Sequence, residues 1–221
     1  MSVSATIALA GHSGTHTAQS IHSKRFFNMQ LYKQLNLPDS LIEEIKNCAL
    51  AEMQDMQFGA MQLYFLKKPQ YVLGKYLKEN YPTLPSLYNC ILFRRPGGYP
   101  QPIHLDCNNE DPPQGMKCAI NIPLINCEDS YMEWFDGNYE IQVATVKGRD
   151  GIIRKHLELI WEEDTEPRCI ERTVIDQPTL VSVNVPHAVT VIDRTRCLIT
   201  FRFATNPSFE EVSAILSGIR P

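Results

Sequence analysis

The sequence predicts a mainly β protein with flanking helices, arranged as a sandwich or jelly roll. The chain has 221 residues and a hydrophobic fraction of 43%, which is enough to build the core of one domain. Between about residues 87 and 205, nine short β-like runs are separated by clusters of Gly, Pro, Asn and Asp. Helical patterns occur before and after this part instead of alternating with it, which argues against a βαβ fold.

The N-terminal part of the chain is expected to support this β-rich core. Residues 1–23 are rich in Ser, Thr, Gly, Ala and His, which is typical of a flexible segment. The region 24–86 is predicted to be mainly helical, although Phe26–Tyr32 could form a first strand. One amphipathic helix is expected over 37–55 and a second over 69–81, because apolar residues recur there at helical spacing.

The predicted core spans residues 87–205 and is followed by a C-terminal region, 206–221, that carries one more helix. That helix should begin after Ser208, a residue suited to an N-cap, and end before Gly218. The polar stretch 147–155 is interpreted as a turn. The expected strands are 88–94, 102–106, 116–124, 131–135, 139–146, 157–161, 168–174, 179–185 and 195–204.

Composition narrows the cellular setting and the possible partners. A net charge of -4 gives no general attraction to phosphate backbones, so a nucleic-acid partner is less expected. Seven cysteines without a Cys-x-x-Cys pair indicate free thiols in a reducing compartment. No run approaches the ~20 apolar residues of a membrane helix, and no basic residue precedes the short apolar run at the start. We therefore expect a soluble, cytoplasmic protein, and the sequence does not decide its oligomeric state.

The run from Arg196 to Arg202 carries two arginines on one face of a predicted strand. Side chains alternate along a strand, so these two share a face with Leu198 and Thr200, while Cys197 and Phe203 belong to the apolar face. Guanidinium groups on an otherwise apolar strand are costly to bury unless an anion meets them. The pattern predicts an anion near this face.

Three residues have the character of a metal site. His104 and Asp106 stand two apart and so share one face of an extended segment, and His187 follows 81 residues after Asp106. Two imidazoles and one carboxylate on one side of a metal leave open positions on the other, which suits non-haem Fe(II) chemistry. Each residue alone has a plainer interpretation: a strand histidine is often a core or surface residue, and His-x-Asp occurs by chance.

With Arg196 nine residues after His187, the sequence resembles the 2-oxoglutarate and Fe(II)-dependent dioxygenases. The resemblance spans roughly residues 88–203. The His-to-Arg spacing is similar to that of the oxygen-sensing prolyl hydroxylases. The run Arg-Cys-Leu-Ile-Thr-Phe-Arg is similar to that of nucleic-acid alkyl-lesion demethylases, except that Leu198 stands where those enzymes keep a polar residue.

This resemblance implies a double-stranded β-helix, the cupin-like jelly roll, with Fe(II), 2-oxoglutarate and O2 as cofactors and cosubstrates. It implies that His104, Asp106 and His187 bind the iron and that Arg196 pairs with the distal carboxylate of 2-oxoglutarate. The implied reaction is hydroxylation or demethylation of a substrate, with release of succinate and CO2. Arg202 lies six residues further along, about 20 Å on an extended strand. It could reach the keto-acid end, or form a salt bridge at the barrel rim.

Further pocket residues are expected from strand parity. Asn121 alternates with isoleucines, so its amide should face the pocket if they face an outer core, although it could instead bond to backbone. Tyr88 and Tyr99 flank the first metal-ligand segment and are candidates for contacts to cosubstrate and substrate, with a plain core role as the alternative. Met132 and Trp134 are candidates for the substrate side. Cys107 is expected on the face opposite Asp106.

Two other function classes fit parts of the sequence. One is a cupin-like metal protein, an isomerase or sensor, that uses the same ligands without oxygenase activity. The other is an interaction module in which the His-x-Asp pattern is coincidental. For an oxygenase, the sequence favours a small molecule or a protein side chain as substrate over a nucleobase. The insert at 138–172 is long enough to form a substrate-recognising lid.

Overall fold

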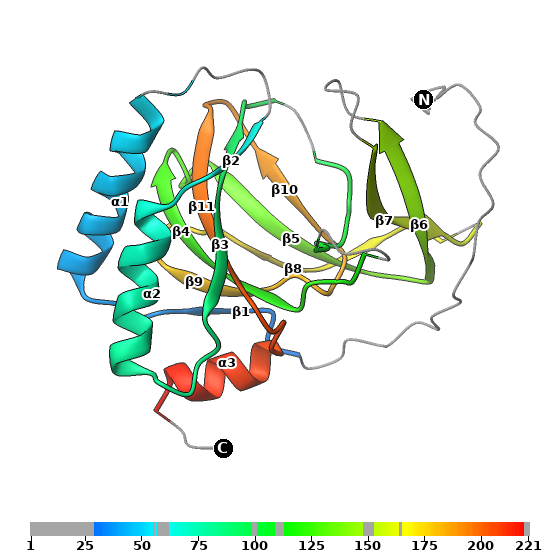
Figure 1. The fold of residues 1–221 in the computed structure, drawn as a ribbon. Helices are drawn as coiled ribbons and strands as arrows, with labels where there is room; N and C mark the ends of the chain where they lie inside the picture. Colours follow the sequence, from blue (N-terminus) through cyan, green and yellow to red (C-terminus); the bar gives the residue numbers. More distant parts are fainter. Residues whose placement is uncertain are drawn as a thin grey trace.

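The computed structural model describes residues 29–54, 56, 62–98, 101–108, 113–147, 153–163 and 165–218. The predicted flexible segment 1–23 lies outside these residues, as do residues 26–28 of the strand expected at 26–32. Of the described remainder of that strand, only Tyr32 belongs to a strand, so the expected strand begins later than predicted. Within the described residues, two antiparallel sheets face each other and helices lie outside one of them (Figure 1). This confirms a mainly β protein with flanking helices.

The larger sheet has six strands and the smaller sheet has three. In spatial order the larger sheet contains β1 (Tyr32–Gln34), β9 (Thr179–Ser182), β4 (Cys118–Ile125), β11 (Arg196–Phe203), β3 (Leu87–Arg95) and β2 (Gln62–Phe65). The smaller sheet contains β10 (His187–Val191), β5 (Ser130–Asp136) and β8 (Arg168–Thr173). From β8 to β11 the chain alternates between the sheets at each strand, which is the jelly-roll topology of a double-stranded β-helix.

A separate hairpin, β6 (Tyr139–Lys147) and β7 (Ile153–Trp161), is inserted between β5 and β8. It forms a two-stranded sheet of its own at the side of the sandwich away from the helices (Figure 1). The prediction of a turn through residue 155 was wrong, because β7 begins at Ile153 and pairs along its whole length with β6. Polar residues there do not prevent strand pairing, since the hairpin is partly exposed on both faces.

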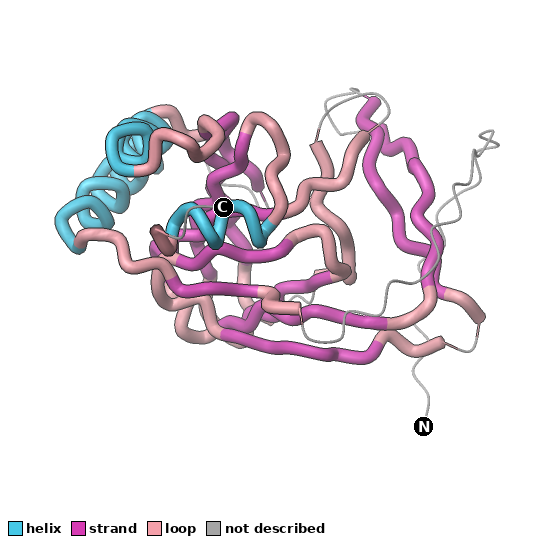
Figure 2. The backbone as a smooth tube through the Cα atoms, turned by 90° about the horizontal axis from the view of Figure 1, so that it is seen from below, coloured by secondary structure: helices cyan, strands magenta, loops and turns pink. Residues whose placement is uncertain are grey.

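The helices α1 (Asp39–Gln54), α2 (Lys68–Asn80) and α3 (Phe209–Leu216) confirm the three helical predictions. All of them supply residues to the core on the outer face of the larger sheet. Figure 2 shows the three helices from below. The predicted N-cap of α3 is present, because the Ser208 hydroxyl accepts from the Glu211 amide and Glu211 bonds back to the Ser208 amide. Gly218 follows at φ +70°.

The two faces of β11 belong to two different cores, as its alternation predicted. Cys197 and Phe203 pack with the helices, whereas Leu198 packs in the space between the two sheets. The same division holds for β4, where Ile120 and Ile122 face the helices and Ala119 faces the interior. The inner face of the larger sheet is therefore the face on which polar side chains meet the interior of the sandwich.

Two predicted strands need correction, and two observed strands were not predicted. Residues 102–106 form no continuous strand, and pairing there is limited to single bridges at His104 and Cys107. β9 ends at Ser182, earlier than predicted, and β10 begins directly after Pro186, where the sequence suggested a break. Proline removes one backbone donor but does not prevent a strand from starting at the next residue. β2 was not predicted, because a four-residue edge strand shows little periodicity.

Candidate metal centre

His104, Asp106 and His187 are brought together at the inner edge of the smaller sheet. The two histidines lie opposite each other in an antiparallel bridge, with the amide of each donating to the carbonyl of the other at 2.9 and 3.0 Å. Their ring centroids are 4.5 Å apart. One ligand atom from each of the three residues lies within 4.8 Å of the others. The backbone bridge is what converts an 81-residue separation into one cluster.

Each imidazole is oriented by a carbonyl two residues before it. The Nδ1 of His104 lies 3.0 Å from the Pro102 oxygen, and the Nδ1 of His187 lies 2.9 Å from the Val185 oxygen. A carbonyl only accepts, so Nδ1 carries the proton and Nε2 keeps its lone pair. The two Nε2 atoms lie 3.6 and 4.0 Å from Oδ1 of Asp106. Three lone-pair donors therefore face one small volume.

Arg202 fixes the remaining member of the cluster. Its Nη2 donates to Oδ2 of Asp106 at 2.9 Å, and its Nη1 donates to the Cys107 carbonyl at 3.2 Å. Oδ2 is thereby engaged, and Oδ1 is the oxygen directed at the histidines. The salt bridge considered for Arg202 is present, with Asp106 as its partner, and contact of Arg202 with the keto-acid end of 2-oxoglutarate stays a prediction. It acts on a metal-ligand candidate, as outer-shell partners of metal sites often do.

The charges of the cluster suit a cation. Burial alone would raise the pKa of the Asp106 carboxyl, but Arg202 and the two histidines hold it well below its usual range. Burial, together with the charge of His104, lowers the pKa of His187 to about 4. The carboxylate is thus ionised and His187 neutral at neutral pH, the protonation states that a metal ligand requires. The donor set of two imidazoles and one carboxylate fits Fe(II).

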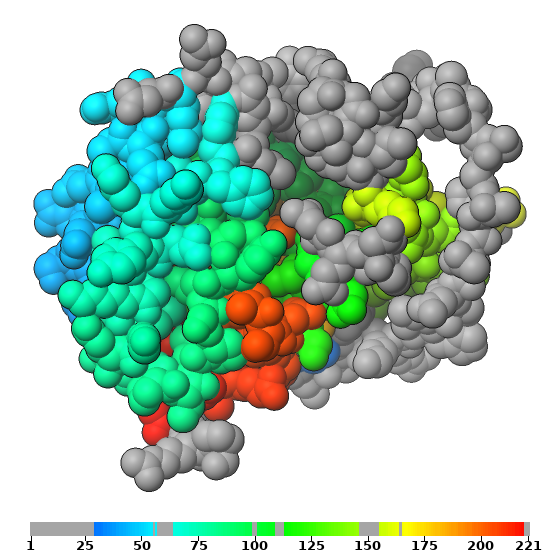
Figure 3. Space-filling model, viewed as in Figure 1, coloured from blue at the N-terminus to red at the C-terminus, as the bar shows by residue number. Residues whose placement is uncertain are grey.

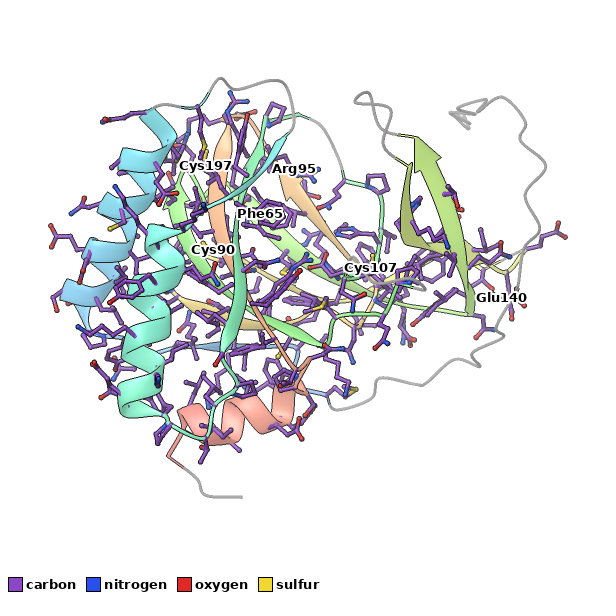
Figure 4. All side chains as sticks on the ribbon, in the orientation of Figure 1. Phe65, Cys90, Arg95, Cys107, Glu140 and Cys197 are labelled. Carbon is purple, nitrogen blue, oxygen red and sulfur yellow. The ribbon has the colours of Figure 1, made fainter. Side chains whose placement is uncertain are left out.

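A cavity of about 720 Å³ opens beside these residues. His104, Asp106 and Arg202 line it together with the inner face of β3 from Asn89 to Arg95. Phe65 and Tyr88 also line it, with exposed fractions of 62% and 59%. Figure 4 shows Cys90 and Cys197 on the helix side of the larger sheet, and Phe65, Arg95 and Cys107 on the opposite side. Contrary to expectation, Cys107 lines the same cavity as Asp106.

The other residues predicted to bind the cosubstrate lie at different depths. Arg196 is on the inner face of β11 but is only 4% exposed and does not line the cavity. Asn121 also points inward and is buried, and its Oδ1 accepts a hydrogen bond from the Thr200 hydroxyl at 2.8 Å. Tyr88 is the member of this group that stands at the rim. Binding of 2-oxoglutarate by these residues stays a prediction.

Two of the three residues predicted for the substrate side are described, and both lie away from the cavity. Met132 and Trp134 are buried in the core between the sheets, and neither lines the cavity. The Trp134 indole donates to the Ser182 carbonyl at 2.8 Å and stacks on Tyr32, so its polar atom is already satisfied. This placement gives both residues a packing role. Tyr99 lies outside the described residues.

Sequence reasoning missed several lining residues. Gln101 places its amide nitrogen 3.1 Å from Nε2 of His104, the atom that a metal would take. Asn89 is directly opposite Arg202 on the neighbouring strand, and its buried Oδ1 has no partner among the described residues. Arg95 occupies the other end of the same strand. Parity along β3, applied as it was to β11, could have found Asn89 and Arg95.

Comparison with models of known protein families and with curated protein sequences gives no match. Among solved structures, the chain is similar to HygX from Streptomyces hygroscopicus with nickel and 2-oxoglutarate bound, at 10% identity over 77% of this chain and 80% of that one (TM-score 0.43). It is also similar to a Pseudomonas putida prolyl-4-hydroxylase, at 15% identity over 78% and 90% (TM-score 0.41). A third similar structure is AviO1 from Streptomyces viridochromogenes Tue57, at 12% identity over 82% of this chain and 93% of that one (TM-score 0.45).

Proposed function

We propose that the protein is an Fe(II)- and 2-oxoglutarate-dependent oxygenase. The observation that carries this proposal is the convergence of two imidazole Nε2 atoms and one carboxylate oxygen beside an open cavity. His104, His187 and Asp106 would hold the iron through these atoms. When bound, iron with 2-oxoglutarate and O2 supplies the oxidising chemistry that hydroxylates or demethylates a C–H site and releases succinate and CO2.

Residues around the cluster would orient the reaction and keep water away. Arg202 holds the Asp106 carboxylate so that one oxygen is presented, and the backbone carbonyls hold both imidazoles in the ligating tautomer. We assign Arg196 to the distal carboxylate of 2-oxoglutarate, as the sequence resemblance implies. Asn121 and Tyr88 are kept as further cosubstrate contacts, and Tyr99 as a substrate contact.

The substrate class follows from the rim of the cavity. Two exposed aromatic rings, Phe65 and Tyr88, suit an apolar or planar group, and the volume suits a small molecule or one protein side chain. The hairpin β6–β7 is the proposed substrate-recognising lid. Its Leu157 side chain comes within 3.7 Å of a Cβ placed on Gly115, close to the metal-ligand segment. The seven free cysteines support a reducing compartment such as the cytoplasm.

Uncoupled turnover tests the proposal. Wild-type protein incubated with Fe(II), 2-oxoglutarate and O2 should form succinate slowly without any substrate, and a panel of amino acids, peptides and modified nucleosides should include compounds that accelerate it. His187→Ala should abolish succinate formation, while Arg168→Gln, at an exposed position that does not line the cavity, should not. A cupin-like isomerase or sensor would bind the metal without forming succinate, and an interaction module would bind no metal at all.

A further inference from the structure

Two arginines stand directly opposite each other on neighbouring strands of the larger sheet. Arg95 is the last residue of β3, Arg196 is the first residue of β11, and the two are partners in the antiparallel register. Both belong to the inner face of the sheet. Like charges placed opposite each other are unfavourable in a sheet, so the pairing calls for a physical reason.

Neither guanidinium has the anionic partner that burial requires. Nη1 of Arg95 and Nε of Arg196 are buried without a hydrogen-bond partner, and within the described part of the chain no carboxylate forms an ion pair with either. Burial lowers the pKa of both arginines, and the charge of Arg196 lowers that of Arg95 further. Arg202, by contrast, is matched by Asp106. Cys127 is the side-chain hydrogen-bonding neighbour of Arg196, so neither guanidinium is matched by a carboxylate. A buried charge without such a partner is costly, so this pair indicates an absent anion.

The backbone holds this arrangement in place. Gly97, which follows β3, packs against the turn that precedes β11. A Cβ at this position would lie 2.2 Å from the Asp193 carbonyl oxygen. The next amide, of Gly98, donates to the Val191 carbonyl at 3.0 Å. Only glycine permits this close backbone contact, and the contact holds the end of β3 beside the start of β11. The two arginines are therefore fixed as neighbours.

Arg95 is the member of the pair that shares a cavity with the metal-ligand candidates. Arg95 lines the cavity, whose wall follows β3 from Asn89, the partner of Arg202, to Arg95, the partner of Arg196. One end of this wall thus adjoins the Asp106 carboxylate, and the other presents the unmatched positive charge. A ligand that meets the metal with one end and an arginine pair with the other must be an anion at its far end.

We propose that Arg95 is an anion-binding residue that forms, with Arg196, a two-guanidinium site for the distal carboxylate of a 2-oxo dicarboxylate. This inference rests on the proposed function and adds to it a second, unanticipated arginine from another strand. A carboxylate has about four lone-pair sites, so it can accept from two arginine forks at once. Two charges should also make the site strongly selective for a dicarboxylate over a monocarboxylate.

Calorimetric titration of Mn²⁺-loaded protein with 2-oxoglutarate tests this directly. Arg95→Gln should weaken binding at least about tenfold, the usual contribution of a charge-assisted hydrogen bond, and Arg95→Lys should weaken it less. Arg168→Gln removes one exposed positive charge and should leave the affinity unchanged. With 2-oxobutyrate, which lacks the distal carboxylate, wild type and Arg95→Gln should bind equally. Equal affinity of these two proteins for 2-oxoglutarate would overturn the proposal.

Ligand-free stability separates a binding role from a structural one. Arg95→Gln should raise the melting temperature of the metal-free protein by about 2 to 4 °C, because it removes the repulsion with Arg196. A purely structural Arg95 would give a lower melting temperature instead, which would contradict the proposal. Circular dichroism of each variant establishes that the sheet is retained.

Inorganic sulfate distinguishes failure of this inference from failure of the proposed function. Added sulfate should raise the melting temperature of wild type more than that of Arg95→Gln, compared with chloride at equal ionic strength. If wild type binds no 2-oxoglutarate but shows this sulfate difference, the proposed function fails and the anion site stands. If 2-oxoglutarate binds to wild type, and Arg95→Gln changes neither the 2-oxoglutarate affinity nor the effect of sulfate on the melting temperature, only the two-arginine site fails.

Discussion

The two carboxylate oxygens of Asp106 have different neighbours, because Arg202 binds only one of them. Oδ2 accepts from Arg202 at 2.9 Å, while Oδ1 lies 3.6 and 4.0 Å from the two imidazole Nε2 atoms. A carboxylate held on one side cannot rotate freely to chelate a metal with both oxygens. The arginine therefore sets how the aspartate presents itself, and its net charge balances a carboxylate that would otherwise be buried alone.

Arg202→Gln should weaken metal binding by about 10- to 100-fold, the usual effect of removing an outer-shell partner of a metal ligand. The physical reason is that Asp106 loses both its orientation and the charge that holds its pKa low. Titration with Mn²⁺, followed by calorimetry, measures the change. The exposed Arg168→Gln variant is the charge-matched control, and equal Mn²⁺ affinities of the two variants would contradict this account.

Acid should destabilise the metal-free protein through His187. Its folded-state pKa is about 4 against an ordinary 6.5, since burial and His104 disfavour the charged form. Between these values the unfolded chain binds a proton that the folded chain does not, so stability falls as pH drops from about 6.5 to 4. Across this pH range, the melting temperature of His187→Gln should change less with pH than that of the wild type. An unchanged pH dependence in His187→Gln would contradict this account.

At the scale of elements, strand parity was the part of the sequence that predicted most. Alternation in β11 and β4 correctly assigned Leu198 and Asn121 to the inner face, because a two-residue period fixes sidedness whatever the partner strand. The segment around His104 could not be predicted as a single bridge, since pairing depends on β10, a distant strand. The burial of Trp134 likewise depends on Tyr32 and Ser182, which lie far away in sequence.

The C-terminal helix offers a test at the scale of one element. Ser208→Ala should lower the free energy of unfolding by about 1 kcal/mol, because it removes the hydroxyl that accepts from the Glu211 amide. α3 buries Phe209 and Val212 against the core of the larger sheet, so the loss should reach the whole domain. Denaturant titration measures it. Glu210→Gln lies in the same turn outside the capping box and should cost less; an equal cost would argue against the cap.

The β6–β7 hairpin should be dispensable for folding and needed for substrate selection. Its two strands pair with each other and, within the described residues, with no strand of the sandwich. Replacing residues 140–160 by a short Gly-Ser linker should therefore keep the melting temperature within a few degrees and retain Mn²⁺ binding. Substrate-stimulated succinate formation should fall to the uncoupled level. A variant that unfolds would instead assign the hairpin to the core.

At the scale of the whole molecule, the two sides of the sandwich do different work. The helices and the larger sheet form one continuous apolar core, whereas the cavity and the metal-ligand candidates lie on the inner side of that sheet. In the space-filling view, α1 and α2 cover the side opposite the hairpin (Figure 3). Among the described residues, no helix is long and apolar enough to cross a membrane. The helices thus pack on the outer face of the larger sheet, while its inner face contributes both to the core between the sheets and to the wall of the cavity.

A metal bound at this place would link segments that only backbone bridges connect, and this makes it a global stabiliser. His104 and Asp106 precede β4, while His187 begins β10, so the cation would close a loop of about 80 residues. Binding to the folded state alone stabilises by mass action, about 2.7 kcal/mol at a hundredfold excess over Kd. Mn²⁺ should accordingly raise the melting temperature by roughly 5 to 10 °C, and EDTA should reverse the change. The increase should vanish in His104→Ala and persist in His156→Gln. Its persistence in His104→Ala would place the metal elsewhere.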